Sequence, residues 1–429
     1  MLHECVGATT VMFGVSGRLG AVPAHWRSVA TLMSGTLGAQ AIGAISMLFL
    51  TRVYTPAEFG RYALFFAVAN LLMLLATARY EQAVFVAKRS EESVQLTLLA
   101  IVLSGVAAVV VLILAAGMIL FRIESPWTPV RYCLLGLVVA SGGSLQALNA
   151  LATQQQTYGR VSRSRLIQSI VAALVNSVLG VLGLGAEGLA LGLFCGQLLA
   201  CLMLLRGLEF RNSFDLTGLT AVARDYIQFP RYSLPGEFLN NVGNNLISFA
   251  TPSLFGAAPL GQYNLGQRVA AVPLGVIGSA MGDVFRAGIS PQRATPEMVT
   301  ILFRRTTIRL ATIGLMLTLP FFVAGPHIFA LLFGEKWRDA GQYLQLLAPM
   351  MFARFVVSPL SATLLRAGRQ KLDALLQVLF VVGAAVALAV GRLTDDFTAA
   401  VGTLAAIQTV LYGIFFYASF RSAKALSRL

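Results

Sequence analysis

The sequence predicts an all-α polytopic membrane protein, with about twelve transmembrane helices in two six-helix lobes around a central cavity. Its 429 residues are 57% hydrophobic and only 12% charged, which is about half the charged fraction of a soluble globular protein. The mean hydropathy is +0.76, and the apolar runs are long and lack the alternation of β-barrel strands. Helices satisfy their own backbone hydrogen bonds in lipid, so they are the expected elements.

A lipid-crossing helix needs roughly twenty apolar residues at a rise of 1.5 Å per residue, and about twelve segments of the chain are long enough. The first two form a predicted hairpin, because the polar break between them contains Pro56 and Gly60, which favour a turn. In order, the segments are 29–50, 60–78, 95–121, 131–152, 166–184, 187–205, 232–255, 262–285, 306–324, 341–363, 373–391 and 397–420.

The seventh segment, 232–255, is the most polar, since it contains Pro235, Glu237 and four asparagines. We retain it because omitting it would place the arginine-rich stretch 286–309 on the outer side of the membrane. That placement would oppose the tendency of Lys and Arg to remain in cytoplasmic loops. With the seventh segment included, both termini are predicted to be cytoplasmic.

The distribution of basic residues supports this orientation. Most of the 32 Lys and Arg residues fall on the predicted cytoplasmic side, and this bias accounts for the net charge of +14 better than a nucleic-acid partner does. Two arginines, Arg268 and Arg354, lie within predicted spans. The outer segments hold only Arg52, Arg61, Arg122, Arg131, Lys336, Arg338 and Arg392.

The spans divide the chain into five parts. No connection between them is long enough to fold as a domain of its own. In order, we expect a cytoplasmic tail at 1–27, a six-helix N-lobe at 28–205, a cytoplasmic linker at 206–231, a six-helix C-lobe at 232–420 and a cytoplasmic tail at 421–429.

Two local matches indicate that the lobes are repeats of one another. The second span opens on Phe-Gly-Arg-Tyr at 59–62, and the eighth opens on Leu-Gly-Gln-Tyr at 260–263. A Gly-Arg pair at 159–160 precedes the fifth span, and another at 368–369 precedes the eleventh at nearly the same offset. Six helices is an even number, so the copies run in the same direction. An axis along the membrane normal would relate them, with a cavity between.

Three arginines are the candidate substrate ligands. Arg268 lies within the eighth span and Arg354 near the middle of the tenth, where a charge is costly unless it faces a cavity or a partner. Neither has a basic counterpart in the first lobe, where the repeat offsets lead to Ala67 and Leu145. A ligand would explain these unmatched charges. The third candidate, Arg52, ends the first span. Each of the three could instead bond helix carbonyls or extend to the interface.

Asparagines on the seventh span form a second candidate group. Asn241 and Asn245 share a helix face with Ser248, and Glu237 lies one turn earlier on that face. Their oxygens suit a hydrated cavity that binds substrate or a cation, although hydrogen bonds between helices would use the same side chains. Arg79 and Glu81 directly follow the second span. Glu81 could pair with Arg79, gate the cavity or lie in solvent.

Catalytic residues, a metal site and a cofactor are not expected. The three histidines are scattered, and two of them, His3 and His25, lie in the N-terminal tail. The four cysteines show no metal-ligand spacing. Nothing in the sequence resembles a glycine-rich loop with a lysine that cradles phosphates, which argues against a nucleotide-driven motor.

The opening hairpin resembles that of a known family. Ser-Gly-Thr at 34–36, Ala-Gln at 39–40 and Leu-Thr-Arg-Val-Tyr-Thr-Pro-Ala-Glu-Phe-Gly at 50–60 are similar to the start of bacterial oligosaccharide flippases. These form the polysaccharide-transport branch of the multidrug/oligosaccharidyl-lipid/polysaccharide (MOP) exporter superfamily, the Wzx-type proteins. Arg-Tyr-Glu-Gln-Ala at 79–83 resembles their next motif. In the second half the resemblance lies mainly in the layout of the helices.

The resemblance implies a transporter of the bacterial inner membrane. Such a protein turns undecaprenyl-diphosphate-linked oligosaccharide repeat units from the cytoplasmic to the periplasmic leaflet, for assembly of O-antigen, capsule or exopolysaccharide. Its expected partners are this lipid-linked oligosaccharide, membrane lipids, and the polysaccharide polymerase and chain-length machinery. Arginine binds phosphate oxygens bidentately, which suits a diphosphate. If an H⁺ or Na⁺ gradient drives the transport, Glu237 and Asp283 are candidate coupling residues.

Two other functions remain open. Drug or metabolite exporters of the same fold commonly carry a carboxylate in the first helix, and 29–50 contains none. A membrane-embedded polysaccharide polymerase or ligase would present acidic or histidine residues on a sizeable periplasmic loop. The longest outer connections here, near 123–130 and 333–341, are short.

Overall fold

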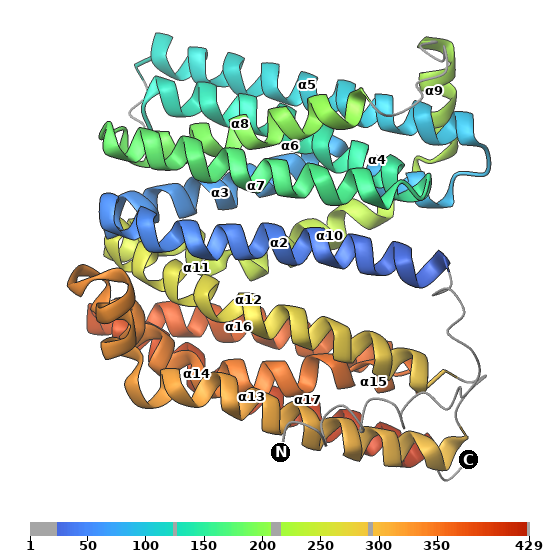
Figure 1. The fold of residues 1–429 in the computed structure, drawn as a ribbon, viewed down its shortest axis with the longest axis vertical. Helices are drawn as coiled ribbons and strands as arrows, with labels where there is room; N and C mark the ends of the chain where they lie inside the picture. Colours follow the sequence, from blue (N-terminus) through green and yellow to red (C-terminus); the bar gives the residue numbers. More distant parts are fainter. Residues whose placement is uncertain (1–23, 123–126, 207–215, 291–294, 427–429) are drawn as a thin grey trace.

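The computed structural model describes residues 24–122, 127–206, 216–290 and 295–426, and these residues contain helices and turns but no β-strand. Most of the helices run nearly side by side along one direction (Figure 1). They are α2 (Ala24–Val53), α3 (Pro56–Thr77), α4 (Tyr80–Ala83), η1 (Val84–Val86), α5 (Ser90–Leu120), α6 (Pro129–Gln154), α7 (Tyr158–Val181), α8 (Gly185–Leu205), α9 (Leu216–Asp225), η2 (Phe229–Ser233), α10 (Leu234–Asn244), α11 (Leu246–Phe255), α12 (Ala257–Gly288), α13 (Pro296–Phe333), η3 (Glu335–Trp337), α14 (Arg338–Leu360), α15 (Ala362–Arg366), α16 (Gln370–Thr394) and α17 (Phe397–Leu426).

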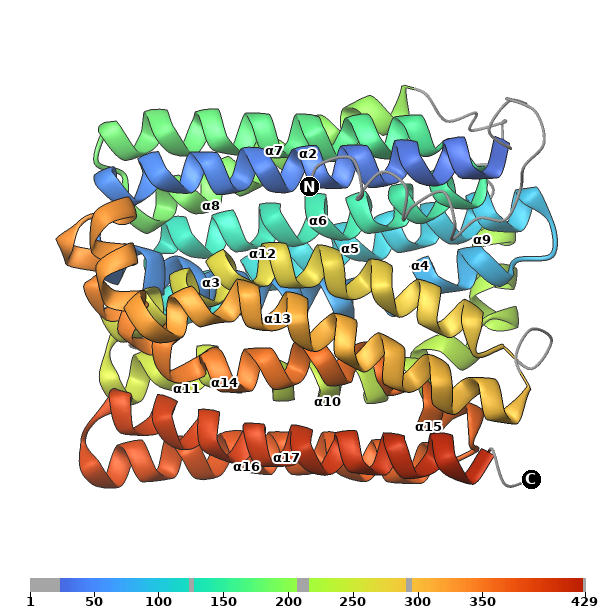
Figure 2. The same cartoon turned by 60° about the horizontal axis from the view of Figure 1, so that its bottom comes forward.

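The helices group into two lobes (Figures 1 and 2). In the N-lobe, drawn in blue to green, α2 packs on α7, α5 on α6 and α7 on α8. In the C-lobe, drawn in yellow to red, α12 and α13 pack on α14, and α16 packs on α17. The main contact between the lobes is that of α3 with α12. The predicted two-lobe, all-α fold is therefore confirmed.

Both predicted tails are partly helical. Helix α2 begins at Ala24, so the end of the predicted tail 1–27 belongs to the first long helix. Helix α17 continues to Leu426, so most of the predicted tail 421–429 extends the last one. The remaining residues of both tails lie outside the described part of the chain.

The linker between the lobes contains a short helix, α9. Leu219 and Val222 on α9 are buried, and the helix packs against α5 of the N-lobe. The Tyr80 hydroxyl donates a hydrogen bond of 3.0 Å to the backbone oxygen of Ala223. The described part of the linker is therefore attached to the N-lobe. Residues 207–215 lie outside the described part.

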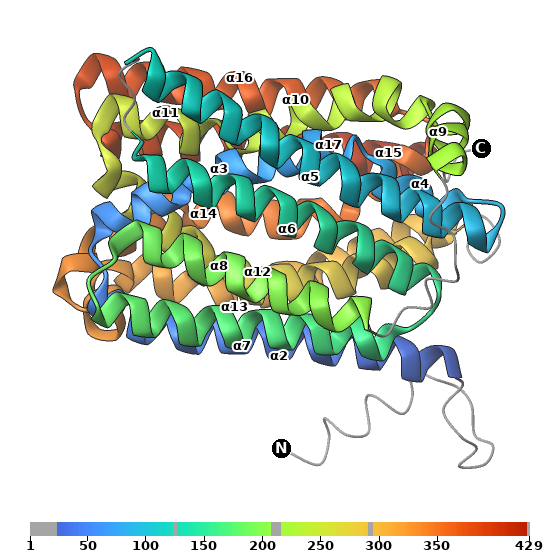
Figure 3. The same cartoon turned by 90° about the horizontal axis from the view of Figure 1, so that it is seen from above.

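Among the described residues, eleven helices are long and apolar enough to cross a membrane, as expected for a multi-pass membrane protein. The seventh predicted span, 232–255, is instead divided into α10 and α11, which follow one another along the bundle (Figure 3). The break falls at Asn245, with φ −103° and ψ 8°. Its side chain donates to the backbone oxygen of Asn241 at 2.9 Å, and such bonds to the preceding turn bend helices.

The turn between α2 and α3 comprises only Tyr54 and Thr55. The side chain of Thr55 accepts a hydrogen bond from the Glu58 backbone, and the Glu58 carboxylate accepts one of 2.7 Å from the Thr55 backbone. This capping box satisfies two amides at the start of α3. Pro56 occupies the first turn, where its missing N–H is not needed. Gly60, expected in the turn, lies inside α3.

Gly60 and Gly261 are where the backbones of α3 and α12 touch. An ideal Cβ on Gly60 would lie 1.7 Å from the backbone oxygen of Ala257, and one on Gly261 would lie 1.9 Å from that of Pro56. In both helices the contacted oxygen lies four positions before the glycine. The two contacts are therefore equivalent under the internal repeat, and a pseudo-twofold axis passes between the glycines.

Replacing Gly261 by alanine should weaken the contact between the lobes. A new methyl group would overlap the backbone oxygen of Pro56, and overpacking of this kind costs roughly 1–3 kcal/mol. We expect Gly261→Ala to lower the midpoint of thermal unfolding of the purified protein in detergent. In the control Gly105→Ala, the new methyl group has no atom within 4 Å. Equal midpoints for the two variants would contradict the close contact.

Candidate functional site

A large cavity lies inside the C-lobe. It has a volume of about 880 Å³ and is lined by residues of α10, α11, α12, α14, α16 and α17. We call it the C-lobe cavity. Its lining extends from Ser361 and Asp373, at the end of α14 and the start of α16, to Tyr263 and Leu404, near the starts of α12 and α17. It therefore runs along the bundle from the end opposite the α2–α3 turn.

A second cavity of about 430 Å³ lies along α12 and α14. It shares Gln267, Arg354 and Ser358 with the C-lobe cavity and continues to Arg286, near the end of α12. Its wall on α12 consists mainly of small residues, including Gly275. Arg354 thus lies where the two cavities meet.

Arg354 is exposed on the cavity wall, more than halfway along α14. Among the described residues, no Asp or Glu lies within ion-pair distance of it. Asp373 lines the same cavity but does not pair with it. Within a membrane-spanning region a cation without a fixed counter-ion is costly. The arrangement leaves the Arg354 guanidinium able to bind an anion that enters the cavity.

Arg268 lies at the contact between the lobes, away from the walls of both cavities. Its guanidinium carbon is 5.8 Å from the ring centroids of Tyr62 and Phe66 on α3. Stacking over aromatic rings stabilises a guanidinium and leaves its N–H edge available for hydrogen bonds. The two arginines that the sequence singled out therefore occupy different surroundings, one at the cavity wall and one at the lobe contact.

Arg52 and its neighbours join the lobes at the end where α2 stops. Arg52 donates a hydrogen bond of 3.3 Å to the backbone oxygen of Leu332. Lys336 donates to the backbone oxygens of Arg52, at 3.1 Å, and Tyr54, at 2.8 Å. A cation suits these carbonyls because helix C-termini carry partial negative charge.

Trp337, fully buried, donates to the backbone oxygen of Thr51 at 2.9 Å. We call Lys336, Trp337 and their three carbonyl partners the η3 latch. The sequence predicts that Lys336 lies in an outer loop and indicates no role for either side chain. The partners are backbone carbonyls, which every residue carries, so the sequence contains no signal for these bonds.

At the other end of the bundle, Arg79 lies between two carboxylates. It is 3.7 Å from Glu81 and 3.9 Å from Glu237 of α10, so it connects the N-lobe with the C-lobe. Glu81 is only 5% exposed. Burial raises the pKa of Glu81 above its ordinary value of 4.5, and the hydrogen bond from Thr77 and the charge of Arg79 offset this only in part. Of the predicted gating residues, these three lie together.

Asp283, the fourth predicted gating or coupling residue, lies apart from them. It is exposed near the end of α12 and pairs with Arg286 on the next turn. Such exposed pairs contribute little free energy. The structure therefore does not bring Asp283 together with Arg79, Glu81 or Glu237.

The asparagines of α10 present two faces. Asn245 lines the C-lobe cavity, as does Ser248 of α11, whereas Asn241 does not. Asn240 and Asn244, one position earlier in each pair, line it instead. Paired asparagines at 240–241 and 244–245 support either face equally well, so the sequence alone does not select between them.

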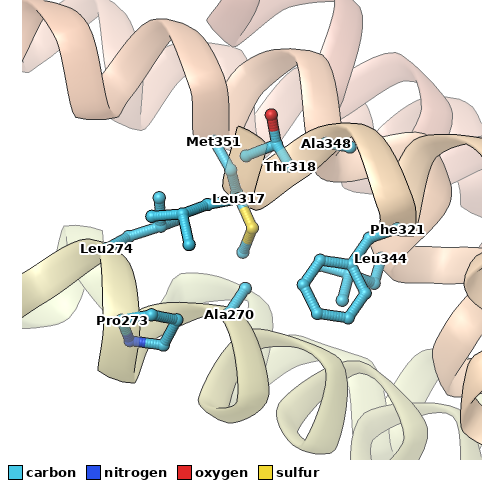
Figure 4. Close-up of a pocket in the computed structure, with 9 residues that line it drawn as sticks. All are labelled: Ala270, Pro273, Leu274, Leu317, Thr318, Phe321, Leu344, Ala348 and Met351. Carbon is cyan, nitrogen blue, oxygen red and sulfur yellow. The ribbon is translucent and has the colours of Figure 1, made fainter. Parts of the chain in front are cut away.

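A small apolar cavity lies between α12, α13 and α14 (Figure 4). Its volume is about 10 Å³, and Thr318 is its one polar lining residue. The Thr318 hydroxyl already donates to the backbone oxygen of Gly314 at 2.8 Å. An apolar void of this size remains dry, so we interpret it as a packing defect of the C-lobe and not as a site.

Comparison with known proteins agrees with this geometry. Residues 49–342 match the family described as polysaccharide biosynthesis protein, which covers both lobes from the end of α2 to the start of α14. The chain belongs to that family. The predicted resemblance to the polysaccharide-transport branch is thereby confirmed.

Two relatives share part of the sequence of this chain. The teichuronic acid biosynthesis protein TuaB of Bacillus subtilis is 26% identical over 37% of this chain and 32% of its own length. The lipopolysaccharide biosynthesis protein WzxC of Escherichia coli is 24% identical over 33% of this chain and 29% of its own length. The matched stretches thus span about a third of each relative.

Solved structures with the same fold are MOP superfamily transporters. One from Pyrococcus furiosus superposes with a TM-score of 0.61 at 13% identity. A mutant of the Vibrio cholerae MATE transporter VcmN superposes with a TM-score of 0.62 at 12% identity. Each match covers 94% of this chain and 96% of the other. Identities this low establish the fold alone.

Glu81→Gln should change how stability depends on pH. Because burial raises the pKa of Glu81, the protonated form is favoured in the folded protein. The buried, protonated Glu81 therefore adds to the stability of the folded protein below pH 4.5, and this added stability is lost as the pH rises through the raised pKa of Glu81. We expect the thermal midpoint of the wild type to fall relative to Glu81→Gln across this window. The exposed Glu91→Gln is the control, and parallel curves for wild type and Glu81→Gln would contradict the prediction.

Proposed function

We propose that this polysaccharide biosynthesis protein is a flippase and not an enzyme. It moves undecaprenyl-diphosphate-linked oligosaccharide repeat units from the cytoplasmic to the periplasmic leaflet of the bacterial inner membrane. The observation that carries the proposal is Arg354, exposed on a cavity of about 880 Å³ without an acidic partner within ion-pair distance among the described residues. A diphosphate offers the oxygen pairs that a guanidinium binds bidentately.

Arg268 supports the same cargo from the contact between the lobes. Its stacking on Tyr62 and Phe66 holds a guanidinium in place without neutralising it. A substrate anion there would touch both lobes at once, because Arg268 belongs to α12 and the rings to α3. An interaction that depends on how the lobes are arranged is what a transporter needs to couple cargo to movement.

The two ends of the bundle differ, since the lobes are joined at one end and the cavity reaches the other. This difference supports transport by alternating access. The η3 latch joins the lobes where α2 ends, and the C-lobe cavity runs to the opposite end. The positive-inside distribution supports a periplasmic position for the latch and a cytoplasmic position for both termini. In this proposal the structure corresponds to the state that receives cargo from the cytoplasm.

Ion coupling, if present, would involve the cluster of Arg79, Glu81 and Glu237. Glu81 is buried, and burial raises its pKa, so the folded protein favours the protonated carboxyl, and a change in the charge of Glu81 alters the bridge between the lobes. Asp283 is a weaker candidate because of its exposed pair with Arg286. Polysaccharide polymerase and chain-length proteins remain the partners that we propose downstream.

Arg354→Ala should abolish surface polysaccharide in cells that depend on this protein. Loss of a charged hydrogen-bond donor costs about 1.5–3 kcal/mol, so transport should fall at least about tenfold. Arg354→Lys, which retains the charge but not the bidentate geometry, should give an intermediate rate. The measurement is translocation of lipid-linked oligosaccharide in proteoliposomes.

Arg309→Ala is the matched control, since Arg309 is exposed on α13 and lines neither cavity. Undiminished transport by Arg354→Ala would eliminate the charged-cavity mechanism. Transport of drug cations without lipid-linked sugar would favour the exporter alternative. Chain extension by the purified protein would favour the polymerase or ligase.

Lys336→Met should open the periplasmic end. The substitution removes two hydrogen bonds from the Lys336 ammonium to carbonyls at the end of α2. Their loss should shift the equilibrium between the closed and the open periplasmic end about tenfold. In a background without the native cysteines, Asn244→Cys reports access to the C-lobe cavity. We expect a membrane-impermeant maleimide to label it from the cytoplasm, and in Lys336→Met also from the periplasm. Unchanged periplasmic labelling would show that the latch does not hold this end closed.

A further inference from the structure

Side-chain amides dominate the polar wall of the C-lobe cavity. Helices α10 and α11 contribute the asparagines at 240, 244 and 245, which were described above. The remaining amides are Asn264, Gln267, Gln377 and Gln408, from α12, α16 and α17. An amide both donates and accepts hydrogen bonds without carrying charge. Such a wall binds a ligand rich in hydroxyl groups and gives little advantage to an apolar one.

The hydrogen bonds within this wall leave acceptors available. Asn244 donates through its NH₂ group to Asn240 at 3.0 Å, Asn264 to the backbone oxygen of Leu260 at 3.1 Å, and Gln267 to the Tyr263 hydroxyl at 2.8 Å. In each case the described bond uses the NH₂ group, so the amide oxygen can accept from a ligand. Hydroxyl groups donate to such oxygens, whereas an ionised carboxylate has no proton to donate and can only accept from the second N–H of an amide.

The charged residues that line the cavity also favour an uncharged ligand. Among the described lining residues, Arg354 is the one basic side chain and Asp373 is the one acidic side chain. Once Arg354 binds the diphosphate of the cargo, no other cation among these lining residues remains for a second anion. Asp373, in the first turn of α16, would repel an anionic group by like charge.

Aromatic rings complete the wall. Phe380 and Tyr412 line the cavity with their ring centroids 4.6 Å apart, and Tyr263 lines its far end. Tyrosine offers an apolar ring with a polar hydroxyl at its edge. A sugar ring presents a matching surface, with an apolar face of C–H groups and hydroxyls around its rim.

We propose that the C-lobe cavity holds the sugar part of the cargo and that it accepts uncharged sugars and discriminates against sugar carboxylates. The proposal rests on the proposed flippase function, in which Arg354 holds the diphosphate. It adds the position of the glycan and its chemical class. Asp373 is then a specificity-determining residue at one end of the cavity.

The test compares two tetrasaccharides on the full-length protein in lipid nanodiscs. Chitotetraose is uncharged, and tetragalacturonate carries one carboxylate on each sugar. Calorimetry should detect binding of chitotetraose and at least about tenfold weaker binding of tetragalacturonate, the effect of about 1.4 kcal/mol of lost hydrogen bonding and added repulsion. Gln408→Leu and Asn244→Leu should each weaken the binding of chitotetraose about fivefold, which is the effect of one lost hydrogen bond. Asp373→Asn should reduce the difference in binding affinity between chitotetraose and tetragalacturonate.

Gln345→Leu is the matched control, because Gln345 does not line the cavity and its side chain bonds elsewhere, to the backbone oxygen of Phe322. Undecaprenyl diphosphate binding is measured on the same samples. If the lipid diphosphate binds but neither sugar does, or if both bind equally, the inference fails and the flippase proposal stands. If chitotetraose binds as expected but the lipid diphosphate does not, the flippase proposal fails. An equal loss in Gln345→Leu and Gln408→Leu also overturns the inference.

Discussion

The contact between Gly60 and Gly261 is the constraint on which the two-lobe arrangement depends. Two long apolar helices in lipid gain little from the hydrophobic effect when they associate, so close packing must hold them together. Here each glycine meets the backbone of the other lobe where a single methyl group would not fit. The lobes therefore meet at one narrow, symmetric crossing, and other connections form at its two ends.

Those connections differ in chemistry. On one side are bonds from a lysine and a tryptophan to backbone carbonyls, and on the other is an arginine shared between two glutamates. Backbone carbonyls do not titrate, whereas a buried glutamate changes its charge when it gains or loses a proton. In the alternating-access transport that we propose, this difference in chemistry around a symmetric crossing would let the two ends open under different conditions.

Hydropathy and charge were sufficient to predict the class and every span except the seventh, because the cost of burying charge in lipid acts on every residue of a span. The repeat was predicted from two short sequence matches. Hydropathy and charge were insufficient where two neighbouring polar residues fit the same helix pattern equally well, so that the pattern did not indicate which of them lines the cavity. The paired asparagines support either face of α10, and packing on the C-lobe selects Asn240 and Asn244 over Asn241. The rings beneath Arg268 were equally invisible, because only the crossing of α3 and α12 brings Tyr62 and Phe66 beside it.

The break at Asn245 has a mechanical consequence. It ends a short helical segment in which η2 runs directly into α10, from Phe229 to Asn244. Glu237, in the first turn of α10, touches the N-lobe through Arg79, and Asn244, at the end of the segment, lines the C-lobe cavity. A continuous span would anchor both positions to the bundle. We expect a short segment to tilt about the kink instead, so that a ligand held at Asn244 would displace the Glu237 carboxylate and thereby change the bridge between the lobes.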